Sequence, residues 1–363
     1  MMARLGDVCK KATSNIAQKD LEGHRGDYPI YGASGFISNV DFFQQENPYI
    51  AVVKDGAGIG RVMKLPAKSS VIGTMQYIIP NDTVDICYLA YAMEDMNLSK
   101  YFTGATIPHI YFKDYQEEEI PLPPLDEQRK IAAVLDKVSD LIAKRRQQLD
   151  KLDELVKARF VEMFGTFPAN EHNWPVGKIR DVIQEAKYGS SRPAVEGGQY
   201  PYLRMNNITY GGELDLTDIK QIDVPESELP KCTVQRGDVL FNRTNSKELV
   251  GKTCVYDSDE MMVLAGFVIR IRVNERVLPE FLSAFLNTDF SKQMLLGICK
   301  TAIGQANINA QEMQNIEIYI PLIELQRQFV QFKKQADKSK LAIQKSLDKL
   351  ETLKMALMQE YFG

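Results

Sequence analysis

The sequence predicts a mixed α/β (α+β) protein in which two globular domains alternate with two long helices. The main observation is an internal repeat: LDKLDELVKARFVEMFG at residues 149–165 recurs as LDKLETLKMALMQEYFG at residues 347–363. Each copy follows a stretch of short β-like runs, and these two stretches do not resemble each other. A chain of 363 residues is also too long for one ordinary core. We therefore expect a pseudo-twofold arrangement of four segments: domain 1–118, helix 119–165, domain 166–316 and helix 317–363.

The first domain is expected to consist of short strands followed by one helix. Its β-like runs begin at Tyr28, Pro48 and Val71, and a helical patch, ICYLAYAMEDM, begins at Ile86. Gly56–Gly60 (GAGIG) resembles a phosphate-binding loop, which requires a helix directly after the glycines. Because RVMKL follows instead, we expect a strand–turn–strand connection.

The first long helix is predicted by an apolar stripe with spacings of three and four residues. Glycine and proline are absent from residues 126–164, and Gly165 is suitably placed to end the helix. About 40 residues at a rise of 1.5 Å give a rod of roughly 60 Å. The stripe consists of Ile131, Leu135, Val138, Ile142, Leu149, Leu152, Val156 and Met163.

The second half repeats this order. Strand-like runs begin at Tyr200, Thr233, Thr253 and Met261, a helical patch begins at Leu278, and the second long helix follows. Narrow apolar stripes require a partner, so we expect the two helices to pair as an antiparallel coiled coil. The second stripe consists of Phe329, Phe332, Ala336, Ile343, Leu347, Leu350, Leu353 and Leu357.

The composition is that of a globular protein, with 44% hydrophobic and 25% charged residues. The net charge of −4 argues against a protein that coats nucleic acid by bulk attraction, although it permits a specific DNA reader. Five scattered cysteines indicate a reducing compartment, and neither a membrane span nor a signal peptide is recognisable. We expect a cytoplasmic protein without membrane association.

No convincing catalytic or metal-binding pattern is present. The three histidines form no spaced pair with each other or with the cysteines, so we expect neither a zinc site nor a catalytic triad. Gly251–Thr253 (GKT) resembles the end of a P-loop, but Ser246 stands where the earlier glycine is required. We therefore expect a binding protein.

Polar residues at turns are the candidates for binding DNA. Arginine and asparagine can read guanine and adenine edges bidentately, whereas serine and lysine more often contact phosphates. The candidates are Lys54, Arg61, Ser190, Ser191, Arg192, Arg204, Asn206, Asn207, Arg243, Asn245 and Lys252.

The chain resembles the specificity subunit of type I restriction–modification systems over essentially its whole length. The resemblance rests on IPLPPLDEQRKIAAVLDKV from Ile120, its weaker echo IYIPLIELQRQFV from Ile318, and the two Phe-Gly endings. IYGASGFI from Ile30, the KDGAGIG turn, and RGDVLFNRT from Arg236 followed by Gly251 and Lys252 strengthen it. Leu325 stands where the motif has glutamate, so docking at the second helix is expected to use different contacts.

The resemblance implies that each domain is a target recognition domain that binds one half of a bipartite double-stranded DNA sequence. The helices would set the spacer and dock two methylation subunits, which would bind S-adenosylmethionine; this chain would hold no cofactor. A separate motor–nuclease subunit would complete restriction. The residues assigned to the spacer helices and to partner docking are Gln128, Arg129, Ile131, Leu135, Leu149, Leu152, Gln326, Arg327, Leu347 and Leu350.

Two alternatives remain at this point. The chain could methylate or cut DNA by itself, although the missing motifs argue against a stand-alone methyltransferase or nuclease. It could also be a coiled-coil adaptor whose globular domains bind proteins, in which case it would bind no duplex.

Overall fold

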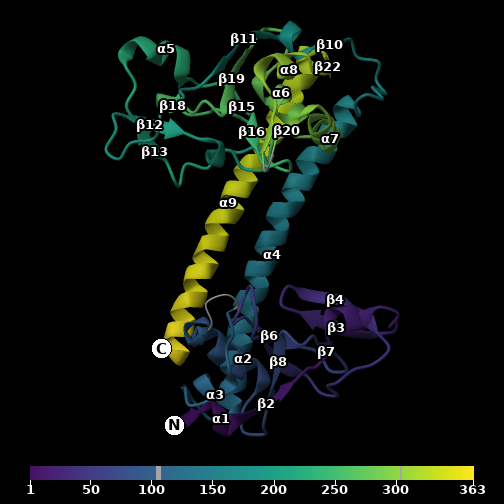
Figure 1. Ribbon diagram of the computed structural model, residues 1–363, viewed down its shortest axis with the longest axis vertical. Coiled ribbons are helices and arrows are strands. Elements are labelled where there is room, and N and C mark those ends of the chain that lie inside the picture. Colours follow the sequence, from purple (N-terminus) through teal and green to yellow (C-terminus); the bar gives the residue numbers. More distant parts are fainter. Residues whose placement is uncertain (104–107, 303–304) are drawn as a thin grey trace. The chain divides into compact units, whose positions relative to one another are not determined.

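The computed structural model describes residues 1–103, 108–302 and 305–363, which form two compact units. Unit 1 comprises Met1–Arg146 and Lys345–Gly363, and unit 2 comprises Gln147–Gln344. Each unit therefore contains one globular head and a section of each long helix. The long helices are α4 (Leu125–Phe164) and α9 (Ile323–Phe362), each of 40 residues, as the repeat predicts (Figure 1).

The head of unit 1 contains a four-stranded antiparallel sheet of order β2-β8-β5-β6 and a three-stranded sheet of order β4-β3-β7, in which β3 and β7 are parallel. A two-stranded sheet, β1-β9, leads to the long helix. The elements are β1 (Met2–Arg4), α1 (Leu5–Val8), β2 (Cys9–Thr13), β3 (Tyr28–Gly32), β4 (Gly35–Val40), β5 (Tyr49–Val53), β6 (Val62–Leu65), β7 (Ser70–Val71), β8 (Met75–Pro80), α2 (Ile86–Asp95), α3 (Phe112–Tyr115) and β9 (Glu119–Pro121).

The head of unit 2 has a four-stranded antiparallel sheet of order β11-β19-β15-β17 and a second sheet of order β13-β12-β18-β14, in which β12 and β18 are parallel. It also contains β10-β22 and a small sheet, β16-β21-β20. The elements are β10 (Val176–Lys178), β11 (Ile183–Tyr188), β12 (Tyr200–Leu203), β13 (Lys220–Ile222), α5 (Leu229–Cys232), β14 (Thr233–Val234), β15 (Val239–Asn242), β16 (Thr244–Asn245), β17 (Thr253–Val255), β18 (Met262–Leu264), β19 (Val268–Val273), α6 (Pro279–Leu286), α7 (Asp289–Ile298), β20 (Lys300–Ala302), β21 (Gln305–Asn307), α8 (Ala310–Gln314) and β22 (Glu317–Tyr319).

The two heads share one topology although their sequences differ. The order β2-β8-β5-β6 corresponds to β11-β19-β15-β17, and β4-β3-β7 corresponds to β13-β12-β18, including the parallel pair. In both heads a helix follows, along the chain, the second strand in this sheet order: α2 follows β8, and α6 follows β19. The duplication therefore extends beyond the helices whose repeated sequence revealed it.

The glycine-rich segment Gly56–Gly60 connects β5 to β6, which pair as antiparallel neighbours. Gly56, Gly58 and Gly60 have φ values between 79° and 85°, a region that favours glycine. The predicted strand–turn–strand connection is therefore confirmed. The segment is not a phosphate-binding loop, because no helix follows it.

Within each unit the two long helices run antiparallel, as predicted. In unit 1, Leu135 near the start of α4 packs with Met358 near the end of α9. In unit 2, Phe160 near the end of α4 lies 5.2 Å from Phe329 near the start of α9, measured between ring centroids. The predicted apolar stripes thus form the seams between the helices.

Leu353 is an exception to the predicted stripe, since it is 45% exposed. The neighbouring Lys354 takes the inward position because α9 also packs against α2 here. Its ammonium group lies 3.1 Å from Glu94 Oε1 and 5.4 Å from the Tyr91 ring centroid. A third element beside the helix pair therefore shifts the buried face by one residue.

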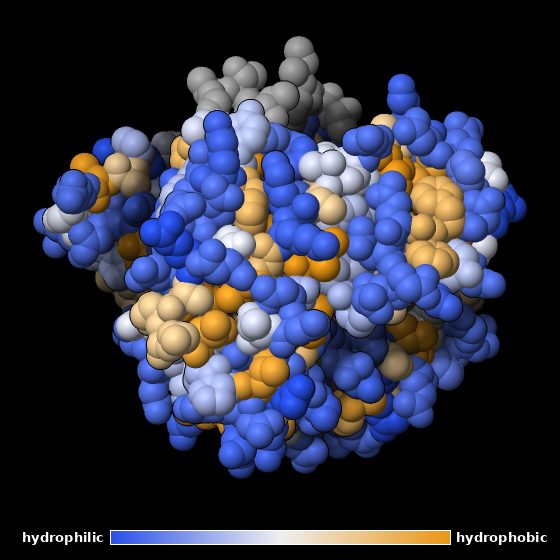
Figure 2. Space-filling model, turned by 90° about the horizontal axis from the view of Figure 1, so that it is seen from below, coloured by the Kyte–Doolittle hydropathy of each residue, from blue (hydrophilic) through white to orange (hydrophobic). Residues whose placement is uncertain are grey.

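No helix in the described ranges is both long enough and apolar enough to cross a bilayer. On the face that Figure 2 shows, hydrophobic side chains form small patches separated by hydrophilic ones. The two long helices exceed the roughly 20 residues that a span requires, but charged residues occur along both.

Candidate nucleic-acid interface

Six of the predicted DNA-binding residues line one pocket of about 520 Å³ in unit 2. They come from three segments that directly follow β11, β12 and β15. Tyr202 and Phe267 add aromatic surface, and Phe267 is 54% exposed. The six residues are Ser190, Ser191, Arg192, Arg204, Asn206 and Arg243.

The parallel pairing of β12 with β18 explains this convergence. Because parallel strands end at the same edge of a sheet, Arg204 after β12 and the turn after β18 emerge together. The segment after β11 is held against this turn, since Ser190 N–H donates to Leu264 O at 2.6 Å and Gly266 N–H donates to Ser190 O at 2.7 Å. A Cβ on Gly189 would collide with the Leu264 main-chain oxygen, so this position requires glycine.

Two of the three pocket arginines are paired with carboxylates. Arg192 lies 2.7 Å from Glu228, and Arg204 lies 2.8 Å from Asp218. The arginines hold the pKa of both carboxyl groups below their ordinary values through these hydrogen bonds. The carboxylates orient the guanidinium groups, but they also compete with any phosphate for them.

Arg243 is held differently. Its guanidinium carbon lies 4.8 Å from the Tyr188 ring centroid, and Nη2 donates to Asn307 Oδ1 at 3.1 Å. The Nε atoms of Arg204 and Arg243 are buried, and neither has a hydrogen-bond partner within the described part of the chain.

Lys54 and Arg61, the two candidates in unit 1, lie at opposite ends of the turn between β5 and β6. Lys54 Nζ donates to Asp55 Oδ2 at 2.6 Å, and Arg61 Nη1 donates to Ala33 O at 2.8 Å. Asp55 Oδ1 is also hydrogen-bonded to His109 Nδ1. Asp55 and His109 are not among the predicted candidates, because 54 residues separate them and no spaced motif marks the pair.

Asn207 and Lys252 were predicted to contact DNA. The structure corrects this prediction, because both side chains are buried and hydrogen-bonded within unit 2. Asn207 is 2% exposed, and its amide donates to the main-chain oxygens of Asp215 and Asp218. Lys252 is 7% exposed, and its ammonium group donates to the main-chain oxygens of two residues near the end of β12, Met205 and Ile208. Burial lowers the pKa of Lys252.

Asn245 and Ser190 also have structural tasks. Asn245 does not line the pocket, and its Oδ1 accepts a hydrogen bond from Ser246 N–H at 2.8 Å. Ser190 lines the pocket but is only 7% exposed, and its Oγ accepts from Arg192 N–H at 3.2 Å. Ser191, Arg192 and Asn206 are exposed.

Most residues assigned to partner docking are interior residues of the helix seams. Gln128 and Gln326 are fully buried, so their side chains serve the spacer helices rather than contact with a partner. Leu135 and Leu347 are also buried, and Ile131, Leu149, Leu152 and Leu350 are half-buried. Only the side chains of Arg129 and Arg327, which are 62% and 60% exposed, remain available to a partner.

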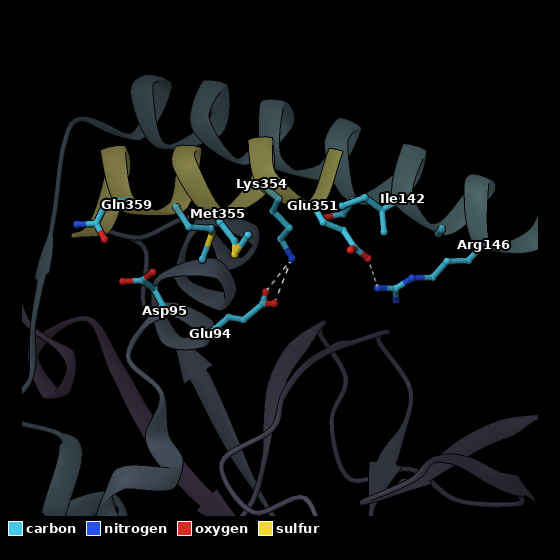
Figure 3. A pocket seen from close by; sticks show the side chains of 11 residues that line it. Glu94, Asp95, Ile142, Arg146, Glu351, Lys354, Met355 and Gln359 are labelled. Atoms are coloured by element: carbon cyan, nitrogen blue, oxygen red, sulfur yellow. Dashed lines mark hydrogen bonds and ion pairs between the residues drawn. The ribbon is translucent and has the colours of Figure 1, made fainter. Parts of the chain in front are cut away.

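A groove of about 910 Å³ in unit 1 has a different chemical character. It runs between α2, α4 and α9 and is crossed by the ion pairs Arg146–Glu351 at 2.7 Å and Lys354–Glu94 at 3.1 Å (Figure 3). Met355, which is 65% exposed, also lines it. Paired charges beside methionine suit contact with protein better than contact with phosphate.

Within the described residues, no group of three or more histidine, cysteine or acidic side chains could hold a metal ion.

The chain matches the family model described as "Type I restriction modification DNA specificity domain" over residues 1–154 and 171–354. It is similar to the type I restriction enzyme MjaVIII specificity subunit of Methanocaldococcus jannaschii, with 27% identity over 98% of this chain and 90% of the relative. It is 24% identical to the EcoKI specificity subunit of Escherichia coli K12 over 73% of this chain, but the match spans only 61% of the length of that relative.

Solved structures with the same fold include the S subunit of a type I restriction–modification system from M. genitalium. That structure covers this chain completely with a TM-score of 0.61 and 15% identity. A second structure, from work on complex assembly and conformational transition of a type I system, covers 99% with a TM-score of 0.55 and 17% identity. At these identities the likeness concerns the fold.

Proposed function

This chain belongs to the family of type I restriction–modification DNA specificity domains, and we propose that it recognises a bipartite DNA target with one half-site for each head. The observation that carries this proposal is that two heads of one topology have different sequences, so one backbone arrangement presents different side chains in each head. The chain is a non-catalytic specificity subunit. A stand-alone methyltransferase or nuclease is not favoured.

The unit 2 pocket supports DNA binding by its composition. Arg192, Arg204 and Arg243 supply planar donors for phosphates or guanine, and Asn206 is exposed for a base edge. Phe267 offers apolar surface beside them. A net charge of −4 is compatible with DNA binding at this pocket, because the local arrangement of donors governs the contact rather than the charge of the whole chain.

The long helices would set the distance between the half-sites. Each helix has 40 residues, which corresponds to roughly 60 Å at 1.5 Å per residue. In both units their seams are apolar and antiparallel, as a stiff spacer requires. The proposed spacer length follows from the helices, and the half-site sequences follow from the heads.

The helices would also dock two methylation subunits, which would bind S-adenosylmethionine and carry out methyl transfer. A motor–nuclease subunit would join the complex for restriction, in the cytoplasm. Apolar side chains on the outer helix surfaces support protein docking. They are Val134, Leu141, Leu155 and Val161 on α4, and Leu341, Leu353 and Met355 on α9, all at least 37% exposed.

The test is to sequence the methylome of host cells with and without this chain. We expect a bipartite methylated motif that disappears when the chain is deleted and returns on complementation. Methyl transfer by the purified chain alone would instead support the enzyme alternative. Failure to bind any duplex, with methylation subunits present, would support the adaptor alternative.

A further inference from the structure

Lys54 of unit 1 and Arg243 of unit 2 occupy the same place in the shared fold. Each directly follows the third strand of its four-stranded sheet, β5 or β15. The main-chain N–H of Lys54 donates to Thr74 O at 3.0 Å, and that of Arg243 donates to Phe267 O at 3.0 Å. Two cations therefore stand at equivalent positions although the surrounding sequences differ.

The residues next to these cations face partners that are related by the internal repeat. Asp55 forms an antiparallel bridge with His109, and Thr244 pairs with Asn307 between β16 and β21. His109 and Asn307 are separated by the repeat offset, as are Leu149 and Leu347. One backbone arrangement thus presents a unit 1 cluster (Lys54, Asp55 and His109) and a unit 2 cluster (Arg243, Thr244 and Asn307).

Side-chain bonds connect the members of each cluster. In unit 1, Lys54 Nζ lies 2.6 Å from Asp55 Oδ2, and Asp55 Oδ1 pairs with His109 Nδ1. In unit 2, Arg243 donates to Asn307 Oδ1 at 3.1 Å, and Asn307 Nδ2 donates to Thr244 Oγ1 at 3.0 Å. These bonds fix the side chains before a ligand arrives, which reduces the entropy lost on binding.

Each cluster lies beside an exposed tyrosine. The Tyr111 ring centroid is 4.2 Å from that of His109, and the Tyr188 ring is 4.8 Å from the Arg243 guanidinium carbon. The side chains of Lys54, Asp55 and His109 are 19–25% exposed, so their polar atoms are not sealed in the core. A base edge can therefore reach the unit 1 cluster beside an aromatic surface. In unit 2 it can reach the half-buried Arg243 and Asn307, whereas Thr244 is only 5% exposed and supports Asn307 from the interior.

We propose that these two clusters are the specificity-determining positions at which each head reads its half-site. This inference rests on the proposed function as a bipartite DNA reader. A common backbone position fixes where a base pair is met, and the different side chains determine which base pair is accepted.

The side-chain chemistry assigns a base class to each cluster. In unit 1, Lys54 can donate to guanine O6 and N7, while Asp55 can accept from the cytosine amino group, so the pair is complementary to a G·C base pair. In unit 2, Arg243 is complementary to guanine and Asn307 to adenine, so that cluster reads purines. The two clusters therefore accept different sets of bases, a G·C pair in the unit 1 half-site and either purine in the unit 2 half-site.

The test uses the full chain with its methylation subunits and determines the methylated motif in Asp55→Asn and Asn307→Asp variants. Asp55→Asn should relax one position of one half-site and leave the other half-site unchanged, and Asn307→Asp should do the reverse. Loss of the bidentate contact of Asn307 with adenine corresponds to a roughly 5- to 150-fold loss of discrimination at that position, and loss of the single Asp55 contact should lie toward the lower end of this range. Asp259→Asn, which removes an exposed carboxylate paired with Arg236 outside both clusters, is the matched control.

If a variant no longer supports methylation, its specificity is measured instead by its affinity for the cognate duplex and for base-substituted duplexes. A folded variant that loses affinity for the cognate duplex but not for a base-substituted one supports the inference. Equal loss for all duplexes, or an unchanged motif in both variants, would overturn it while leaving the proposed function intact. The proposed function itself fails only if the wild-type complex shows no bipartite specificity.

Discussion

The buried amide of Gln128 joins the start of α4 to the start of α2: its Oε1 accepts a hydrogen bond from the main-chain N–H of Asp85 at 2.8 Å. Gln326 repeats this bond with the main-chain N–H of Leu278, also at 2.8 Å. Each Nε2 donates to the proline oxygen five residues earlier, Pro123 or Pro321. The glutamine of the repeated motif therefore anchors each long helix to its own head.

Replacing the anchoring glutamine in either unit, Gln128 or Gln326, should lower the free energy of unfolding. Gln128→Ala leaves the N–H of Asp85 without its acceptor, and each buried group left unpaired costs about 1–3 kcal/mol. The free energy of unfolding from urea denaturation measures the loss, and Gln326→Ala should give a similar value. Arg129→Ala, at an exposed neighbour, should change it by less than about 0.5 kcal/mol. Equal effects of the two substitutions in α4 would contradict the anchoring role.

Lys340 should hold the Tyr210–Glu213 segment against the helix pair of unit 2. Its ammonium group lies 2.9 Å from Glu213 Oε1 and also pairs with Asp153 of α4. Burial acts to lower the pKa of Lys340, but the hydrogen bonds to the two carboxylates outweigh it and raise the pKa. Lys340→Met should therefore speed amide hydrogen exchange in this segment.

The matched control for this substitution is Lys338→Met, at an exposed position on the same helix. Only the Lys340 variant should accelerate exchange at Gly211, Gly212 and Glu213. Unchanged exchange in both variants would show that main-chain bonds, such as Gly212 N–H to Thr209 O, suffice to hold the segment.

The long helices could be predicted from sequence because their apolar periodicity is local. The anchoring glutamines could not, since the burial of Gln128 depends on α2, which lies far away in the sequence. For the same reason Leu353 was assigned to the seam, although the proximity of Glu94 turns Lys354 inward instead. Helical periodicity identifies the apolar face of a helix, but it does not show which distant element, here α2, packs beside that face.

The candidate site could be predicted only in part. Residue type and position after strands led to the pocket arginines, but not to their pairing with Glu228 and Asp218. The same reasoning included Lys252, which is buried because its ammonium group bonds to the main-chain oxygens of Met205 and Ile208, more than 40 residues earlier in the chain. His109 and Asn307 are related by the repeat offset, but their types differ, so sequence similarity alone does not mark them as equivalent.

Removing the carboxylate that competes for Arg192 should strengthen DNA binding. Glu228→Gln releases the guanidinium group for a phosphate and also removes a negative charge near the backbone. One additional phosphate contact should steepen the dependence of log affinity on log salt by about 0.9. Fluorescence anisotropy with a non-specific duplex, measured over a salt series, checks this.

Asp259→Asn provides the control, because it removes the same charge from the exposed pair with Arg236 outside the pocket. Its salt slope should remain that of the wild type. If both variants showed the same slope, a general change in net charge would explain the effect and Arg192 would have no special role.

Lys292 should make the stability of unit 2 depend on pH. Burial, aided by the charges of Lys252 and Lys157, lowers the pKa of Lys292 to about 7, and its ammonium group donates to Gly251 O at 2.7 Å. An unfolded lysine has a pKa near 10.4, so between about pH 7 and 10 the unfolded chain binds more protons than the folded one. The titration of Lys292 therefore raises the free energy of unfolding as pH rises, by at most about 1.4 kcal/mol per pH unit.

Denaturation at pH 7 and pH 9 tests this dependence. Lys292→Met should flatten the pH slope relative to wild type, whereas Lys247→Met, at an exposed position, should leave it unchanged. A Lys292 variant with the wild-type slope would show that the lysine titrates near its ordinary pKa in the folded protein.

The helix pair should act as the spacer of the bipartite site, so its length should determine the number of base pairs between the half-sites. One heptad inserted into α4 between Val138 and Leu149 preserves the phase of the apolar stripe, provided that a matching heptad enters α9 opposite it. Seven residues add about 10.5 Å, which corresponds to roughly three base pairs at 3.4 Å each. Methylome sequencing should then show a longer spacer between unchanged half-sites, with reduced occupancy because three base pairs rotate the duplex by roughly 100°.

Three heptads in each helix add about 32 Å, close to one duplex turn, and should restore occupancy with a spacer nine or ten base pairs longer. A heptad in α4 alone misaligns the seam and should abolish methylation. An unchanged spacer after matched insertions would show that the helices do not determine the distance between the half-sites.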